Sequence, residues 1–281
     1  MSFIAACVQL NSGRDIAPNI ATAADLVRRA RDAGGQFIMT PEVSDMIEPK
    51  RALRLEKARA ESDHPMLAAW RALARETGAH LLLGSVMLRE TGAERLLNRS
   101  FLIAPDGEIM ARYDKIHMFD VDLPGGESYR ESAVFRPGDR AVLAPLPWGL
   151  LGMSVCYDLR FPQLYRALAL GGADFLAVPA AFTVPTGRAH WHVLLRARAI
   201  ENGSFVFAPA QDGEHAEGRR TYGHSLIVAP WGEVLAEAPE GVGFITAEID
   251  PGRIEEARRS VPSLRHDRPF AAPAKPPLAA E

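Results

Sequence analysis

The sequence predicts an α/β fold, a four-layer α-β-β-α sandwich with internal pseudo-twofold symmetry. An internal repeat is the first observation: residues 100–111 (SFLIAPDGEIMA) match residues 225–236 (SLIVAPWGEVLA) in register. Apolar strands alternate with amphipathic helices in both halves, which is typical of α/β proteins. The strands at 80–86 and 175–179 are apolar on consecutive positions, which indicates sheets covered on both faces. Two half-units packed sheet against sheet, with helices outside, satisfy all three observations.

The first half is expected to run strand, helix, strand, helix, strand and hairpin. Strands are predicted within residues 4–10, 34–42 and 78–86. Helices are predicted over 20–34 and 64–78, because apolar residues recur three and four positions apart and each segment finishes on glycine. The hairpin then turns at an Asp-Gly pair, a common two-residue turn.

The second half repeats this order. Strands are predicted within 151–158, 171–180 and 203–211, and helices over 161–172 and 188–203. The matching hairpin turns at Trp-Gly. The two halves are therefore interpreted as structural twins.

No linker separates the halves, so we expect one domain over residues 1–270. The segment 271–281 is rich in proline and alanine and has little to bury, so we expect an arm or a disordered tail.

Composition narrows the class of protein. The 281 residues are 47% hydrophobic with a net charge of -3, which supplies no broad basic field for nucleic acid or anionic lipid. No apolar run reaches the length of a membrane span, and the amino terminus lacks a basic leader, so we expect a cytoplasmic protein. Its two cysteines, Cys7 and Cys156, would stay as thiols there. A small-molecule substrate is favoured over nucleic acid or membrane.

Three strand ends carry chemically suggestive residues. Glu42 ends the strand of residues 34–42, Cys156 ends a strand of the second half, and Lys115 follows the first hairpin. Ligand sites in α/β sheets gather at the carboxyl ends of strands, so these side chains are expected to converge. The repeat breaks here, because Ala180 lies beside the position that matches Glu42. One half therefore carries chemistry that the other lacks.

A thiol, an amine and a carboxylate in one pocket make an acyl-transfer site. The thiolate attacks a carbonyl, the carboxylate takes the thiol proton, and the ammonium stabilises the oxyanion. We expect Lys115, and any helix that begins after Cys156, to lower the pKa of the thiol. Cys7 lies inside an apolar strand without such neighbours, so it is interpreted as a core residue.

Segments around these three residues resemble a known family. Residues 41–45 (PEVSD), 113–132 (YDKIHMFDVDLPGGESYRES) and 155–174 (VCYDLRFPQLYRALALGGAD) are similar to the signature segments of the nitrilase superfamily of carbon-nitrogen hydrolases. They occur in the family order, and the resemblance spans roughly residues 3–270. It implies the nitrilase-like form of the sandwich and a homodimer or larger homo-oligomer.

The resemblance also implies roles for individual residues. Cys156 would be the nucleophile, Glu42 the general base and Lys115 the oxyanion stabiliser. Glu131 would position the lysine, and the backbone amide of Tyr157 would be a further oxyanion donor. The implied cycle forms a thioester acyl-enzyme with release of ammonia, and water then frees the carboxylic acid. It requires no metal or organic cofactor.

The branch of the family is indicated by further segments. Tyr157 and Asp158 follow the cysteine, as in amidases, where nitrilases commonly have Trp-Glu. Residues 181–202 and 208–232 resemble amidases of deaminated glutathione more than ω-amidases that act on α-ketoglutaramate. An ω-amidase, an N-carbamoyl amidohydrolase and a nitrilase remain alternatives. A silent binding scaffold is disfavoured, because such a relative would be expected to lose part of the catalytic set.

Pocket walls are assigned to residues in the loops that select the acyl group. Arg160 either pairs with Asp158 or faces an anionic substrate, and the polar loop with Arg219 and Arg220 is a candidate cover for the pocket mouth. The expected substrate contacts are Tyr129, Arg160, Phe182, Thr183 and Trp191.

Histidines are not interpreted as metal ligands. His190 and His192 are two positions apart on a predicted helix, so they point to different faces and make a poor metal pair. His117 and His224 either line the pocket or form structural hydrogen bonds. We therefore expect no metal site.

Overall fold

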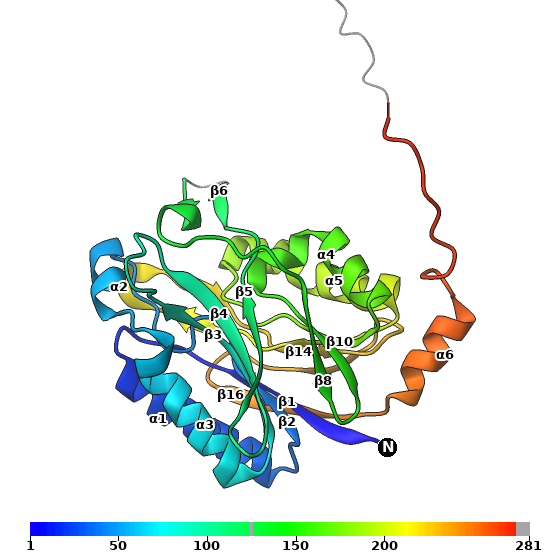
Figure 1. Ribbon diagram of the computed structural model, residues 1–281, viewed down its shortest axis with the longest axis horizontal. Helices are drawn as coiled ribbons and strands as arrows, with labels where there is room; N and C mark the ends of the chain where they lie inside the picture. The colour runs from blue at the N-terminus through cyan, green and yellow to red at the C-terminus, as the bar shows by residue number, and fades with distance from the viewer. Residues whose placement is uncertain (124–125, 274–281) are drawn as a thin grey trace, which may run out of the picture.

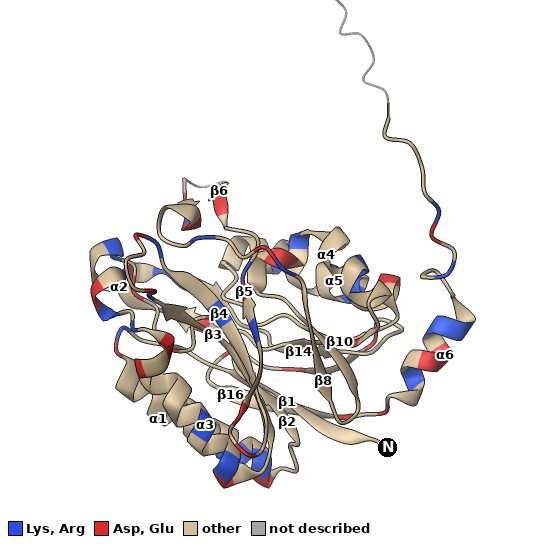
Figure 2. Cartoon of the chain, viewed as in Figure 1, with Lys and Arg blue, Asp and Glu red and all other residues tan. Residues whose placement is uncertain are grey.

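The computed structural model describes residues 1–123 and 126–273 of the chain. Two mixed sheets pack face to face, with helices α1 and α3 outside one and helices α4 and α5 outside the other (Figure 1). The predicted four-layer sandwich is confirmed. Helices α2, α3 and α6 each carry both basic and acidic residues (Figure 2).

The first sheet has the strand order β16-β1-β2-β3-β4-β5. β1, β2 and β3 are parallel, and β4 and β5 continue as antiparallel strands. Helices α1 (Ile16–Asp32) and α3 (Pro65–Thr77) lie close to the predicted segments. The strands are β1 (Phe3–Gln9), β2 (Phe37–Met39), β3 (His80–Leu88), β4 (Leu97–Ile103), β5 (Ile109–Asp114) and β16 (Gly243–Ile249).

The second sheet has the order β15-β14-β11-β10-β9-β8, with the same strand directions as its twin. Helix α4 spans Pro162–Leu170. Helix α5 (Val184–Asn202) begins earlier than predicted, since Pro185 is tolerated in its first turn. The strands are β8 (Val142–Leu146), β9 (Gly149–Met153), β10 (Ala173–Ala177), β11 (Phe205–Ala208), β14 (Leu226–Val228) and β15 (Val234–Glu237).

Short elements connect the layers and were not predicted, because they are too brief and polar to show a period. Several of them border the cavity described below. They are α2 (Arg51–Lys57), α6 (Gly252–Ser260), the ribbons β6 (Asp120–Asp122) with β7 (Ser128–Arg130) and β12 (Asp212–Glu214) with β13 (Arg220–Tyr222), and the 3-10 helices η1 (Glu61–Asp63), η2 (Glu131–Ala133), η3 (Cys156–Arg160) and η4 (Ala216–Gly218).

The core lies on both faces of each sheet. Phe37 and Met39 of β2 pack between the sheets, whereas Ile38 packs under the outer helices with Trp70 of α3. The Phe37 ring meets the Phe207 ring edge to face, with centroids 5.8 Å apart. Strand β2 is therefore buried on both sides, as its continuous apolar run predicts, and its carboxyl end is held firmly.

The last strand joins the two ends of the chain. β16 pairs antiparallel with β1, with Phe3 opposite Ile249, so the second half completes the sheet of the first. After α6 the described chain leads away from the body (Figure 1), and Phe270 is 88% exposed. Residues 274–281, most of the predicted tail 271–281, lie outside the described residues. Among the helices that the structure describes, none is sufficiently long and apolar to cross a membrane.

Candidate active site

Four of the predicted site residues meet at one cavity. Glu42 follows β2, Lys115 follows β5, Cys156 follows β9, and Glu131 opens η2. All four line a cavity of about 760 Å³ at the carboxyl ends of these strands. The volume lies within the range of about 300 to 1,000 Å³ that is usual for small-molecule sites.

The Glu42 carboxylate is almost completely buried, with 4% of the residue exposed. Its Oε1 accepts hydrogen bonds from Asn98 Nδ2 and Lys115 Nζ, both at 2.9 Å, and its Oε2 accepts one from the Ala181 N–H at 3.0 Å. Burial acts to raise the pKa of Glu42, but the charge and hydrogen bond of Lys115 outweigh it and lower the pKa. The carboxylate is therefore anionic and able to accept a proton.

Lys115 is held between two carboxylates. Its Nζ lies 2.9 Å from Glu42 Oε1 and 2.9 and 2.8 Å from the two oxygens of Glu131. Glu131 is fixed in turn by the Phe119 N–H, which donates to its Oε2 at 2.6 Å. Burial opposes the charge on Lys115, but the carboxylates of Glu131 and Glu42 outweigh it and raise the pKa well above the usual value. The amine is therefore a fixed ammonium ion.

Cys156 is the first residue of η3 and lies at the sharp turn that follows β9. Its φ of +51° is in the left-handed region, which a residue with a side chain adopts only under constraint. The turn is held by the Cys156 N–H, which donates to the Pro179 carbonyl at 2.9 Å. Such strain persists where the surroundings enforce it, and it is common at functional sites.

The expectation of a lowered thiol pKa is wrong. Burial and the negative charge of Glu42 raise the pKa of Cys156 well above the usual value, and they outweigh the opposing effect of Lys115. The thiol is therefore neutral at rest and has a carboxylate beside it that can take its proton. Cys7 is fully buried within the core, as predicted.

The sequence suggested an ion pair between Asp158 and Arg160, and the structure does not contain it. The buried carboxylate instead accepts hydrogen bonds from Tyr113 Oη at 2.7 Å, the Val155 N–H at 2.8 Å, and the N–H and Nδ1 of His117 at 3.0 and 2.7 Å. These donors come from the segment around Lys115 and from the turn around Cys156. Asp158 therefore ties the lysine segment to the cysteine turn, and His117 has a structural role.

Replacing Asp158 with asparagine is expected to lower kcat about 10- to 100-fold with little change in KM, because small displacements of reacting groups are costly. The amide nitrogen cannot accept, so at least one buried donor loses its partner, at about 1 to 3 kcal/mol of stability. Steady-state kinetics and thermal unfolding measure both effects. Asp139→Asn, at an exposed residue, is the control. A normal kcat in Asp158→Asn would show that the network does not position the site.

Three of the expected wall residues, Tyr129, Phe182 and Thr183, line the cavity. Trp191 does not occur among the described residues that line it, which corrects the prediction. Its ring packs behind Phe182, with centroids 4.9 Å apart, and its Nε1 donates to the His224 carbonyl at 2.8 Å. Trp191 therefore supports the wall from the far side.

Arg160 is likewise not one of the described residues on the cavity surface. Its guanidinium lies 5.9 Å from the ring centroid of Tyr157 and 5.4 Å from that of Phe182, and its Nη1 is 3.2 Å from His190 Nδ1. Tyr157 itself lines the cavity. The guanidinium therefore lies over the rings of two residues that line the cavity, and Arg160 supports the wall from behind them.

Sequence reasoning missed Arg54, on α2, and Asn98, the partner of Glu42. Asn98 stands beside Arg99 and Ser100 in β4, so the sequence carries no signal that singles it out. Arg54 and Arg219, which was expected near the mouth, both line the cavity. Their Nε atoms are buried and have no hydrogen-bond partner among the described residues. Burial, and then the charge of Arg219, lower the pKa of Arg54, so two cations face the same space.

Comparison with known proteins shows the family to which this chain is related. Residues 4–259 match the model of the carbon-nitrogen hydrolase family. The chain is 40% identical over 265 residues to the deaminated glutathione amidase of Yersinia enterocolitica, a match covering 94% of this chain and 92% of that protein.

Solved structures of other proteins are also similar to this chain. The Caenorhabditis elegans NitFhit protein superposes with a TM-score of 0.88 at 36% identity, covering 95% of this chain and 65% of that chain. A glutamate-to-glutamine mutant of the amidase from Nesterenkonia sp. AN1, in which acrylamide has added to the active site cysteine, superposes with a TM-score of 0.78 at 26% identity. This match covers 92% of this chain and 98% of that chain. The protein belongs to the carbon-nitrogen hydrolase family.

Proposed function

We propose that the enzyme hydrolyses an amide bond of a small acidic substrate through a thioester on Cys156. The observation that carries this proposal is the single cavity that holds a neutral thiol, an anionic Glu42 and a cationic Lys115. These are the nucleophile, base and oxyanion partner that acyl transfer requires.

Acylation begins when Glu42 takes the thiol proton as Sγ of Cys156 attacks the carbonyl carbon. The ammonium of Lys115 and the backbone amide of Tyr157 stabilise the oxyanion of the tetrahedral intermediate. Collapse of this intermediate breaks the C–N bond, and Glu42 gives its proton to the leaving amine. The acyl group remains on sulfur as a thioester.

Deacylation reuses the same groups. Glu42 takes a proton from water, whose oxygen attacks the thioester carbon, and Lys115 again stabilises the oxyanion. The C–S bond then breaks, Glu42 returns the proton to sulfur, and the carboxylic acid leaves. Glu131 keeps the ammonium in place throughout, because it holds Nζ through both of its oxygens.

The cations at Arg54 and Arg219 support a substrate that carries carboxylate groups. A guanidinium binds a carboxylate through directed, charge-assisted hydrogen bonds. We infer deaminated glutathione as the substrate, since relatives about 40% identical carry that name and this compound has a carboxylate at each end. A cavity of about 760 Å³ has room for a molecule of tripeptide size.

The leaving group depends on the substrate. The amide that links the acyl chain of deaminated glutathione to its cysteinyl residue is secondary, so cleavage releases a peptide amine. The ammonia expected from the sequence would come only from a primary amide, such as α-ketoglutaramate. Product analysis therefore separates the main proposal from the ω-amidase alternative.

A panel of substrates tests the function. Deaminated glutathione, α-ketoglutaramate, an aliphatic amide, an N-carbamoyl amino acid and a nitrile are compared by kcat/KM, with peptide amine, ammonia and carboxylic acid all quantified. Deaminated glutathione is expected to have the highest value. A higher kcat/KM for α-ketoglutaramate would assign an ω-amidase, and turnover of only the carbamoyl compound or the nitrile would overturn the amidase proposal.

Arg219→Gln is expected to lower kcat/KM for deaminated glutathione about 10- to 100-fold, mainly through KM, because hydrogen bonds between charged groups contribute about 1.5 to 3 kcal/mol. Hydrolysis of an uncharged aliphatic amide should change much less. Arg54→Gln should behave in the same way, and Arg140→Gln, at an exposed residue, is the control. Equal losses on the charged and uncharged amides would argue against carboxylate recognition.

We also propose that residues 1–270 form one catalytic domain and that the enzyme is a cytoplasmic homodimer or larger homo-oligomer. A reducing compartment would keep Cys156 as a thiol. Exposed apolar side chains support self-association: Val193 and Ile200 lie on one stripe of α5, and Gly232, beside the exposed Trp231, lies next to Ile200. Light scattering is expected to give at least twice the mass of the chain, and a mass of one chain would contradict the proposal.

A further inference from the structure

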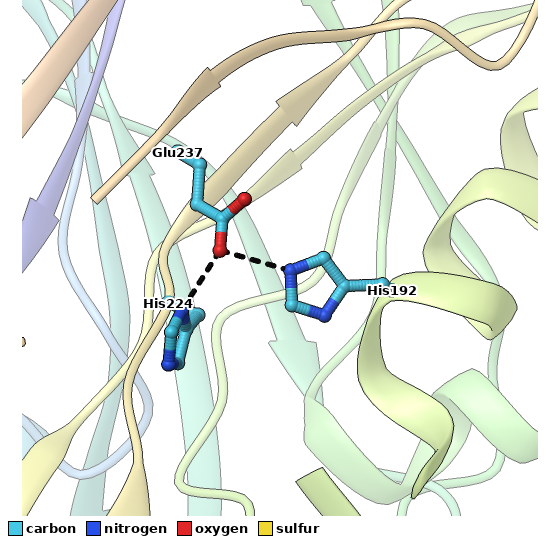
Figure 3. Close-up of side chains that lie close together, drawn as sticks. All are labelled: His192, His224 and Glu237. Atoms are coloured by element: carbon cyan, nitrogen blue, oxygen red, sulfur yellow. Dashed lines mark hydrogen bonds and ion pairs between the residues drawn. The ribbon is translucent and has the colours of Figure 1, made fainter. Parts of the chain in front are cut away.

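Two histidines and a glutamate form a cluster outside the cavity. His192 lies on α5, His224 lies just before β14, and Glu237 ends β15. One ligand atom from each residue lies within 4.8 Å of the others, and both imidazoles point toward the same carboxylate (Figure 3). None of the three is among the described residues that line the cavity, so the catalytic cycle does not account for the cluster.

The distances suit a metal ion. His192 Nε2 lies 3.0 Å from Glu237 Oε1, and His224 Nδ1 lies 2.8 Å from the same oxygen. Bonds of about 2.0 to 2.1 Å to tetrahedral zinc place neighbouring ligand atoms about 3.3 Å apart. The two distances to Glu237 Oε1 would therefore need to lengthen by only a few tenths of an ångström, and the two imidazole nitrogens lie within 4.8 Å of each other.

The cluster is held in place by its neighbours. Trp191 Nε1 donates to the His224 carbonyl at 2.8 Å, and the Tyr222 ring stacks on the His224 ring with centroids 4.4 Å apart. His224 itself has a φ of +53°, a constrained conformation for a residue with a side chain. Because these contacts fix the imidazole before any ion arrives, binding would require little further ordering.

Charge and exposure also suit a cation. The Oε1 atom of the Glu237 carboxylate faces a nitrogen of each imidazole. The three side chains are 32%, 24% and 40% exposed, which leaves the cluster open to solvent. An ion can therefore reach it, and water can complete its coordination.

We propose that His192, His224 and Glu237 bind a zinc ion, with water as the fourth ligand. Two imidazole nitrogens and one carboxylate oxygen form a donor set that zinc accepts, whereas magnesium and calcium prefer sites made of oxygen atoms. The separation of His190 from His192 does not conflict with this proposal, because His190 faces Arg160 and is not a ligand.

The site would connect parts of the second sheet to its helix. Zinc would join α5 to β15 and to the segment before β14, where no covalent link exists among the described residues. The first turn of α5 carries Val184 and Thr186, which line the cavity. Bound zinc therefore stabilises the fold around this wall, and this role does not depend on the identity of the amide substrate.

Zinc chloride titrated into the metal-stripped enzyme, followed by calorimetry and thermal unfolding, tests the site. We expect one zinc per chain and a higher Tm. Loss of an outer-sphere partner alone costs about 10- to 100-fold in metal affinity, so His192→Gln and His224→Gln should each weaken binding by about 100-fold or more. His190→Gln should bind normally, and magnesium chloride should leave Tm unchanged.

A Cys156→Ala variant distinguishes this site from the catalytic thiol and is expected to bind zinc as the unmodified enzyme does. The proposal is overturned if the enzyme takes up no zinc, or if His192→Gln and His224→Gln bind zinc as tightly as His190→Gln. It is also overturned if Cys156→Ala abolishes binding. Hydrolysis plays no part in this readout, so failure here leaves the amidase proposal unaffected.

Discussion

Cys156→Ala is expected to abolish amide hydrolysis while the chain stays folded. The substitution removes the sulfur that forms the acyl-enzyme, and no other described thiol lies at the cavity. Removal of a catalytic nucleophile commonly lowers kcat by about 10⁶-fold, and we expect a loss of at least about 10⁴-fold. Steady-state kinetics measures the loss, and circular dichroism and thermal unfolding establish that the fold remains.

Cys7→Ala is the matched control for the nucleophile. Cys7 is the other thiol of the chain and is fully buried between the sheets, so its removal leaves the cavity unchanged. We expect near-normal kcat and a modest loss of stability from the small space left in the core. Substantial hydrolysis by a folded Cys156→Ala enzyme would exclude the thioester mechanism.

Glu42→Gln is expected to lower kcat by about 10²- to 10⁴-fold, the usual contribution of a general base. Glutamine keeps the shape of the side chain but cannot take the thiol proton. Lys115 retains both oxygens of Glu131, so the substitution does not leave a buried ammonium without a partner. The variant should therefore fold, and its binding of substrate should change less than its turnover.

The pH profile separates the base from a merely structural residue. Lys115 lowers the pKa of Glu42, so the carboxylate is ionised at neutral pH, and activity should fall only as the pH drops through this lowered value. The stability that the charged carboxylate contributes follows the same direction. It is present above the unfolded pKa of about 4.3 and lost as the pH falls through the folded pKa.

In Glu42→Gln, the pH profile of the remaining activity should lose the acid limb, which is the fall in activity caused by protonation of this carboxylate. Glu240→Gln, at an exposed glutamate, is the control and should keep the full profile. If Glu42→Gln retains both normal turnover and the wild-type acid limb, another group is the base.

The fold was largely predictable because each half repeats one order of elements and buries its strands on both faces. The convergence of Glu42, Lys115 and Cys156 followed from a topological rule, since each residue lies within three residues of the carboxyl end of a strand. The short polar elements around the cavity, such as α2 with Arg54, show no period and could not be found in this way. Their placement depends on tertiary contacts.

Side-chain partners were less predictable than backbone positions. Asp158 and Arg160 are two residues apart, yet Asp158 bonds to Tyr113 and His117, which the fold brings from another strand. The prediction that the pKa of the Cys156 thiol is lowered was wrong for a related reason. The sequence shows the charge of Lys115 but not the burial of Cys156.

The cluster of two histidines and a glutamate outside the cavity illustrates the same limit. His192, His224 and Glu237 lie on three separate elements, and no local spacing joins them.

The most direct test of the central claim is to detect the acyl group on Cys156. The enzyme is mixed with deaminated glutathione, quenched in acid within one turnover and examined by intact and peptide mass spectrometry. We predict the mass of the acyl chain, without the peptide amine, on the peptide that contains Cys156, and an unmodified Cys7 peptide. Turnover that proceeds at the full rate with Cys156 unmodified at every time point, or an acyl group on another residue, would contradict the mechanism.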